Sequence, residues 1–152
     1  MYKCLLIMLG SLLSLGMKAQ IGGNAMLIKN KSPFDFEETV ARIQTVLRQK
    51  EIPAFTLFDH SKNAKEVGLN LNPNTVIVFG SPKVGTLLMQ KNPELSIELP
   101  LKISIWQDSD GNVWTAFPNM DRVAKEYNLS EDPILEKMQS LLRDIIRKSI
   151  NQ

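Results

Sequence analysis

The stretch from Thr75 to Met89 (TVIVFGSPKVGTLLM) constrains the fold of this chain more than any other. Its first five residues are β-branched or aromatic and uncharged, which predicts a strand buried on both faces at the centre of a sheet. The loop that follows, Gly80–Thr86, contains two glycines, one proline and one lysine. We therefore expect a tight turn that leads from the sheet into a short apolar segment, and we look for a functional site there first.

Length and charge limit the classes of protein that this chain can belong to. Its 152 residues, 43% of them hydrophobic, suffice for one well-buried core but not comfortably for two. The formal net charge of +2 would fall to about zero if Lys3 and Lys18 were removed with a leader. The sequence has no basic stripe interleaved with aromatic residues, so general nucleic-acid binding is not expected.

Residues 1–19 resemble a targeting segment. Lys3 gives a positive start, residues 4–15 form an apolar run, and a short polar end follows up to Ala19. We predict a signal peptide cut after Ala19, and hence an exported protein, periplasmic or secreted. An uncleaved anchor is the alternative, and it would be the chain's only link to a membrane. The single cysteine, Cys4, lies in this run, so the mature chain would have neither disulfides nor thiolate metal sites.

The remaining chain alternates between strand and helix patterns. The clearest helix covers residues 35–50, where Asp35 and Glu38 form a capping box. Its inner stripe is Phe36, Val40, Ile43 and Leu47. Strands are expected over residues 25–29, 54–58, 75–79, 101–106 and 113–117, and shorter helices over 61–67 and 120–127. The turn at 108–112 makes the last two strands a hairpin.

A last helix, capped by Ser130, carries an amphipathic stripe that could cover the sheet or pair with another chain. The stripe consists of Ile134, Leu135, Met138, Leu141, Leu142, Ile145 and Ile146. The pattern as a whole predicts an α+β domain with an antiparallel sheet and helices on one face. We divide the chain into a signal peptide (1–19), the α+β domain (20–129) and the C-terminal amphipathic helix (130–152).

Several short motifs together resemble the bacterial domain-of-unknown-function-302 family. They are Asp59–His60, Val78–Met89 (VFGSPKVGTLLM), Glu98–Lys102, and Trp106, Asp108, Gly111, Val113 and Trp114 in the hairpin. The resemblance covers roughly residues 25–129. It implies a TBP-like β-α-β4-α fold with a curved antiparallel sheet, and a dimer is compatible with it. It implies no reaction, and a fold alone would not supply one.

The Gly80–Thr86 loop is the first candidate site. Backbone N–H groups freed by Gly80 and Gly85, the cation of Lys83 and a following helix N-terminus could bind an anion, with Ser81 and Thr86 as further contacts. A nucleotide P-loop is not expected, because Thr86 stands where that motif requires lysine. The simpler interpretation is a tight turn that needs glycine.

The only histidine, His60, is the second candidate, beside Asp59 at the end of a strand. An imidazole can act as a base near neutral pH, but neighbouring residues on a strand point to opposite faces, so the two do not form a dyad by adjacency. The third candidate, residues 108–112, has alternating oxygens but has Asn119 where a calcium loop needs glutamate. A hairpin turn explains it better, and we expect neither a metal nor a cofactor.

These residues favour a non-enzymatic protein that binds a small ligand, with anions among the candidates, in a groove near Gly80–Thr86. The candidate contacts are Gly80, Ser81, Lys83, Gly85, Thr86 and His60. One alternative is a cofactor-free hydrolase with His60 as base and Ser81 or Thr86 as nucleophile. Another is a homodimeric interaction module that uses the C-terminal helix or an open sheet edge.

Overall fold

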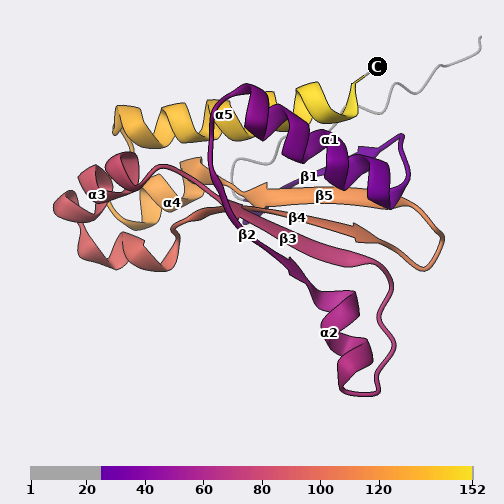
Figure 1. Ribbon diagram of the computed structural model, residues 1–152. Coiled ribbons are helices and arrows are strands. Elements are labelled where there is room, and N and C mark those ends of the chain that lie inside the picture. The colour runs from indigo at the N-terminus through magenta and orange to yellow at the C-terminus, as the bar shows by residue number, and fades with distance from the viewer. Residues whose placement is uncertain (1–24, 152) are drawn as a thin grey trace, which may run out of the picture.

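The structure is a computed structural model that describes residues 25–151. The predicted signal peptide and its cleavage site lie outside the described residues. Within them the structure is an α+β domain, as predicted, with one antiparallel sheet and a layer of helices (Figure 1). None of its helices in this range is long and apolar enough to cross a membrane.

The sheet has five strands in the order β1-β5-β4-β3-β2, and every neighbouring pair is antiparallel. The strands are β1 (Leu27–Ser32), β2 (Ala54–Asp59), β3 (Asn74–Phe79), β4 (Leu101–Gln107) and β5 (Val113–Pro118). The predicted central position of Thr75–Phe79 is wrong, because β4 occupies the centre and β3 lies next to the edge strand β2.

Burial on both faces of β3 was also a wrong prediction. Thr75, Ile77 and Phe79 are buried, whereas Val76 and Val78 on the other face are partly exposed. Because this strand has apolar residues on both faces, its sequence looks like that of a strand covered on both sides. In fact helices cover only one face of the sheet (Figure 1).

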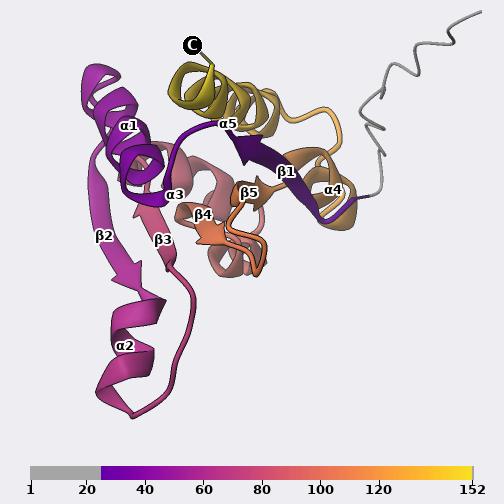
Figure 2. The ribbon, with the colours of Figure 1, turned by 90° about the vertical axis from the view of Figure 1, so that its right-hand side faces the viewer.

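The helices are α1 (Phe36–Gln49), α2 (His60–Glu66), α3 (Pro82–Lys91), α4 (Met120–Glu126) and α5 (Pro133–Ile150), with a 3-10 helix, η1, over Pro93–Ile97. α1 and α5 lie side by side over the covered face, and α3 and α4 lie toward one end of the sheet (Figure 1). α2 extends from the opposite end of the strands and has no buried residue (Figures 1 and 2).

The predicted start of α1 is confirmed. The Asp35 carboxylate accepts a hydrogen bond from the Glu38 backbone N–H at 2.7 Å, so it caps one of the N–H groups that a helix leaves unpaired. Thr39, Ile43, Val46 and Leu47 are the buried residues of the helix. The sequence thus predicted the cap of α1 correctly, but only half of its buried side: Ile43 and Leu47 are buried, whereas Phe36 and Val40 are partly exposed.

The last helix covers the sheet. Its cap is Asp132 rather than the predicted Ser130, because the Asp132 carboxylate accepts a hydrogen bond from the Ile134 N–H at 2.8 Å. The inward residues Leu135, Leu142, Ile145 and Ile146 are at most 2% exposed and join the same core as Ile77, Ile103 and Phe117 from the sheet. The apolar stripe of α5 is therefore part of the domain's own core.

Charged groups connect α1 to α5 at their surface. The Asp144 carboxylate lies 2.5 Å from Lys50 Nζ on the turn after α1, and it also pairs with Arg147 and Lys148. The hydrogen bond from Lys50, followed by that from Arg147, lowers the pKa of Asp144 well below its usual range. Arg42 Nε also donates to the Ser149 carbonyl at 2.6 Å.

The predicted hairpin between β4 and β5 is confirmed, and Asp108 organises it. Its carboxylate accepts hydrogen bonds from the Asp110 and Asn112 backbone N–H groups, from the Asn112 amide and from Trp114 Nε1, the last at 2.8 Å. Gly111 has φ +82°, a conformation that glycine adopts without strain. All these contacts serve the turn, as expected for a hairpin rather than a calcium loop.

Candidate functional site

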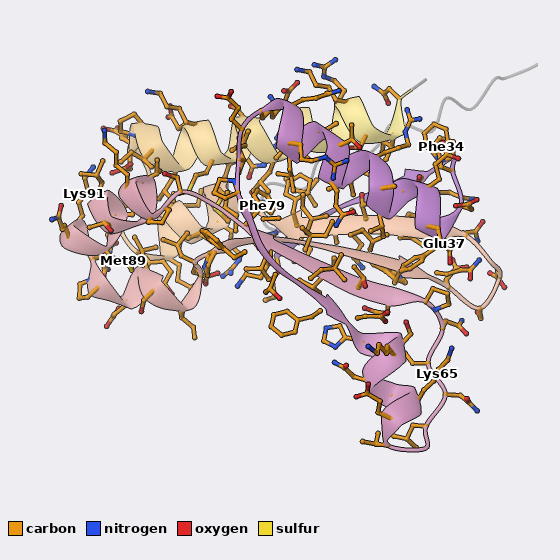
Figure 3. The ribbon with its side chains drawn as sticks, viewed as in Figure 1. Phe34, Glu37, Lys65, Phe79, Met89 and Lys91 are labelled. Carbon is orange, nitrogen blue, oxygen red and sulfur yellow. The ribbon has the colours of Figure 1, made fainter. Side chains whose placement is uncertain are left out.

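An apolar pocket of about 350 Å³ opens at the end of the sheet where β3 passes into α3. It lies between β2, β3, α3, the segment from η1 to β4, and α5. Figure 3 shows two of its lining residues, Phe79 in the middle of the molecule and Met89 on α3. The lining residues are Ile52, Phe55, Phe79, Gly80, Ser81, Pro82, Val84, Gly85, Thr86, Met89, Ser96, Leu99, Pro100, Leu101, Met138 and Leu141.

The chemistry of this lining is that of an uncharged site. None of the described residues that line the pocket carries an ionisable side chain. The polar side chains are the hydroxyls of Ser81, Thr86 and Ser96, and none of them takes part in a hydrogen bond among residues 25–151. The pocket therefore offers a large apolar surface with three hydroxyls to orient a ligand.

The predicted loop takes its shape from its sequence. Ser81 has an extended backbone before α3, and Pro82 occupies the first helical turn, where its missing N–H costs nothing. Phe55 lies close to Gly80, since a Cβ atom there would be 3.7 Å from the Phe55 ring. Gly85 lies inside α3, where a Cβ atom would be 3.6 Å from Leu99 Cδ1, an ordinary contact. Both glycines thus face residues that line the pocket.

The structure brings four of the six predicted site residues to this pocket, namely Gly80, Ser81, Gly85 and Thr86. Lys83 is exposed and is not among the lining residues, although Pro82 and Val84 on either side of it are. The anion site predicted around its ammonium group therefore finds no support in the pocket's chemistry. A charge in an apolar pocket would need a partner that this lining lacks.

His60 lies far from the loop. It follows Asp59, which pairs with Thr75, whereas Gly80 follows Phe79 at the other end of β3. At about 3.3 Å per residue, the two sites are roughly 15 Å apart. This separation is far longer than the hydrogen-bond distance that a reaction with His60 as base and Ser81 or Thr86 as nucleophile requires. His60 instead begins α2, which the Asp59 carboxylate caps through the Lys62 N–H at 2.9 Å.

Sequence reasoning missed the far wall of the pocket. Phe55, Leu99 and Met138 come from three segments that the predicted elements did not place near Gly80. One signal was available: β2 reads AFTLFD, and Phe55, Leu57 and Phe58 are more large apolar residues than one buried face of so short a strand requires. Residues 25–151 contain no group of three or more His, Cys, Asp or Glu side chains arranged to hold a metal ion.

Fold and pocket together define a small α+β domain with a one-sided antiparallel sheet and an uncharged pocket at the sheet's end. The chain belongs to the family described as Domain of unknown function DUF302, which it matches over residues 28–145. This match extends further than the predicted resemblance over 25–129 and includes most of α5. Most of the C-terminal helix therefore lies within the family match, and its apolar residues belong to the core.

A solved structure agrees with this membership. A conserved DUF302 protein from Bacillus stearothermophilus has the same fold, with a TM-score of 0.65 and 17% sequence identity over 82% of this chain and 95% of that one. The chain is also 32% identical, over 114 residues, to the fluoride-specific ion channels FluC 1 of Brucella suis biovar 1 and FluC 2 of Brucella melitensis biotype 1. The match covers 74% of this chain but only 45% and 42% of those channels.

Proposed function

We propose that this protein binds a small, mainly apolar and uncharged ligand in the pocket beside Gly80–Thr86, without catalysing a reaction. The observation that carries the proposal is the lining itself: about 350 Å³ bordered by apolar side chains and by three hydroxyls that make no hydrogen bond within residues 25–151. A cavity of this size lies within the usual range for small-molecule sites. The absence of ionisable lining residues supports a binding role over acid–base chemistry.

A neutral fluorescent dye tests this proposal. We expect N-phenyl-1-naphthylamine to bind with a rise in its emission, and its sulfonated relative 1-anilinonaphthalene-8-sulfonate to bind more weakly, because the lining offers no counter-charge. Gly85→Leu fills the pocket from α3 and should weaken dye binding roughly tenfold or more, since overpacking costs about 1–3 kcal/mol and each 1.4 kcal/mol is tenfold.

The matched control is Ala41→Leu, which adds an apolar side chain on exposed α1, outside this pocket. Equal dye affinity in Gly85→Leu and the control would contradict the proposal, as would the absence of any saturable binding. A ligand that binds the folded protein also raises its stability, by about 2.7 kcal/mol at a hundredfold excess over Kd. Thermal shifts with a panel of neutral metabolites can therefore identify the natural ligand class.

The similarity to fluoride-specific channels makes fluoride a second ligand to test. The chain spans less than half the length of those channels, and the described pocket has no cation to bind a halide. We expect sodium fluoride to cause no more thermal stabilisation than sodium chloride at equal ionic strength, and not to displace the dye. A fluoride-specific shift would favour a role of this domain in fluoride binding instead.

Self-association through the free edge of β2 is a second candidate function. Within residues 25–151, β2 pairs only with β3, and Phe55, Leu57 and Phe58 are 39–49% exposed on it. The other edge strand, β1, carries Lys29 and Lys31. An apolar edge whose one charged residue, Asp59, lies at its end is a template for pairing with another strand. Two copies related by a two-fold axis would pair β2 antiparallel to itself.

Light scattering measures the mass of the protein in solution and so tests whether it dimerises through β2. We expect a dimer whose mass falls to that of the monomer in Phe58→Lys, because lysine on an edge strand opposes pairing. Ile97→Lys is the control, since Ile97 is also apolar and 74% exposed but lies in η1 and not on the free edge of β2. A monomeric native protein, or equal masses of the two variants, would remove β2 as an interface.

A further inference from the structure

A second, smaller pocket lies under the C-terminal half of α5, where that helix crosses β1 and β5. Its volume is about 220 Å³. Ile28 from β1, Phe117 from β5 and Ile146 and Ile150 from α5 give it an apolar floor. Asn30, Arg143, Arg147 and Asn151 complete the lining with polar groups. Figure 2 shows α5 lying over β1.

The described residues do not fully neutralise the positive charge of this pocket. Arg143 has no carboxylate within ion-pair distance among residues 25–151. Arg147 is partly compensated, because its guanidinium lies 2.6 Å from Asp144 Oδ1. None of the described lining residues is an aspartate or a glutamate. Arg143 is therefore the cation available to a ligand.

A buried donor at this pocket also lacks a partner. The side-chain nitrogen Nδ2 of Asn30 is buried and makes no hydrogen bond to any residue of the described range. An unsatisfied buried N–H group costs free energy, so such groups are normally paired with protein, water or a ligand. Asn30 is on the covered side of β1, opposite Thr115, and it lines the same pocket as the two arginines, with its amide nitrogen buried behind the pocket surface.

We propose that this pocket binds a small organic carboxylate with an apolar body, independently of the apolar pocket beside Gly80–Thr86. The Arg143 guanidinium, whose planar N–H groups suit a carboxylate, donates hydrogen bonds to the carboxylate oxygens, and the buried Asn30 amide joins it once the Asn30 side chain rotates toward the pocket. The apolar body lies on Ile28, Phe117 and Ile146. The negative end of the α5 dipole opposes an anion, but this effect falls off within the last turn, where Arg147 and Lys148 compensate it.

Calorimetric titration of the full chain with hexanoate and with its neutral isostere hexanamide tests the proposal. We expect hexanoate to bind, hexanamide to bind at least about tenfold more weakly, since hydrogen bonds to charged groups are the stronger class, and hexanoate affinity to fall with added salt. Inorganic phosphate, which lacks the apolar body, should bind more weakly than hexanoate. No hexanoate binding at millimolar concentrations, or equal affinities for the acid and the amide, overturns the proposal.

Two variants locate the binding site. Arg143→Gln should weaken hexanoate binding about tenfold. Lys137→Gln, which removes the same charge from an exposed position of the same helix, should leave the affinity unchanged. Both positions are exposed, so both variants should fold, and circular dichroism checks this. In NMR spectra, the side-chain amide signal of Asn30 should move on addition of hexanoate. Equal affinities of the two variants, or an unmoved Asn30 signal, place the carboxylate elsewhere.

Discussion

Asp108 shows how one side chain can define a turn. It accepts hydrogen bonds from two backbone N–H groups and from the side chains of Asn112 and Trp114. The hydrogen bond from the Trp114 indole is the largest cause that lowers the pKa of the Asp108 carboxyl, and the Asn112 N–H adds to it. The ionised carboxylate is thus favoured in the folded state.

Replacing this carboxylate gives a prediction with a definite pH dependence. The pKa of Asp108 is lowered on folding from 3.8, so its contribution to stability is complete above that pH and is lost as the pH falls through the folded-state pKa. We expect Asp108→Asn to lower Tm at pH 7 and the difference from the native protein to shrink below about pH 4. Asp110→Asn on the same turn is the control, and an equal loss of Tm in both variants would contradict the role of Asp108.

Gly85 offers a substitution that should stabilise the protein. Alanine in a helix is better than glycine by roughly 0.5–1 kcal/mol, and the Cβ atom at residue 85 would meet only ordinary contacts, 3.6 Å from Leu99 and 3.9 Å from Met89. We expect Gly85→Ala to raise the free energy of unfolding, measured by urea denaturation, by about 0.5–1 kcal/mol. A decrease would mean that the wall of the apolar pocket cannot accept a methyl group.

At the scale of elements, most local sequence signals were reliable, although the cap predicted at Ser130 lies at Asp132, and long-range signals were not reliable. The capping box at Asp35 and the turn at Asp108–Asn112 depend on contacts within a few residues, so the sequence alone predicted them correctly. The position of β3 in the sheet depends on which strands pair with it, and no local pattern encodes that choice. For the same reason four loop residues of the apolar pocket were predicted, while its walls at Phe55 and Met138 were not.

The start of α5 depends on Asp132, which is 7% exposed. Its carboxylate accepts from the Ile134 N–H and pairs with Lys91 of α3 at 2.5 Å. Burial raises the pKa of Asp132, but the hydrogen bonds from Lys91 and Ile134 outweigh it and hold the pKa below the usual value. The residue therefore joins two helices through one ionised group.

We expect Asp132→Ala to destabilise the protein by about 1–2 kcal/mol, because loss of a helix cap typically costs about 1 kcal/mol and the contact to half-exposed Lys91 adds little more. Glu131→Ala, at the neighbouring exposed position, should change stability by less than about 0.5 kcal/mol. Urea denaturation of both variants measures the difference. Similar values for the two would show that Asp132 does not hold the start of α5.

At the scale of the whole molecule, the hydrophobic core on the covered face of the sheet depends on α5. Five of its residues, Leu135, Met138, Leu142, Ile145 and Ile146, belong to the single hydrophobic core. Helices on the other face do not replace them, because the sheet is covered on one side only (Figure 1). The hydrophobic core therefore includes residues on both sides of the boundary that the sequence suggested at residue 129.

A chain that ends at residue 129 should consequently not fold cooperatively. We expect it to lose the sigmoidal unfolding transition, and Leu142→Ala in the full chain to cost about 2–5 kcal/mol, as large-to-small changes in cores do. Circular dichroism during heating and urea denaturation measure these effects. A shortened chain with a native-like transition would show that α1 and the sheet suffice for folding.

The open face of the sheet gives the protein an optical reporter. The chain has two tryptophans, and Trp106 and Trp114 are direct cross-strand partners on β4 and β5, on the side turned away from α1 and α5. Neither borders the apolar pocket beside Gly80. Because the Trp114 indole donates to Asp108, the tryptophan fluorescence of the protein should change when acid protonates Asp108 in the hairpin. It should change little when a ligand occupies the apolar pocket.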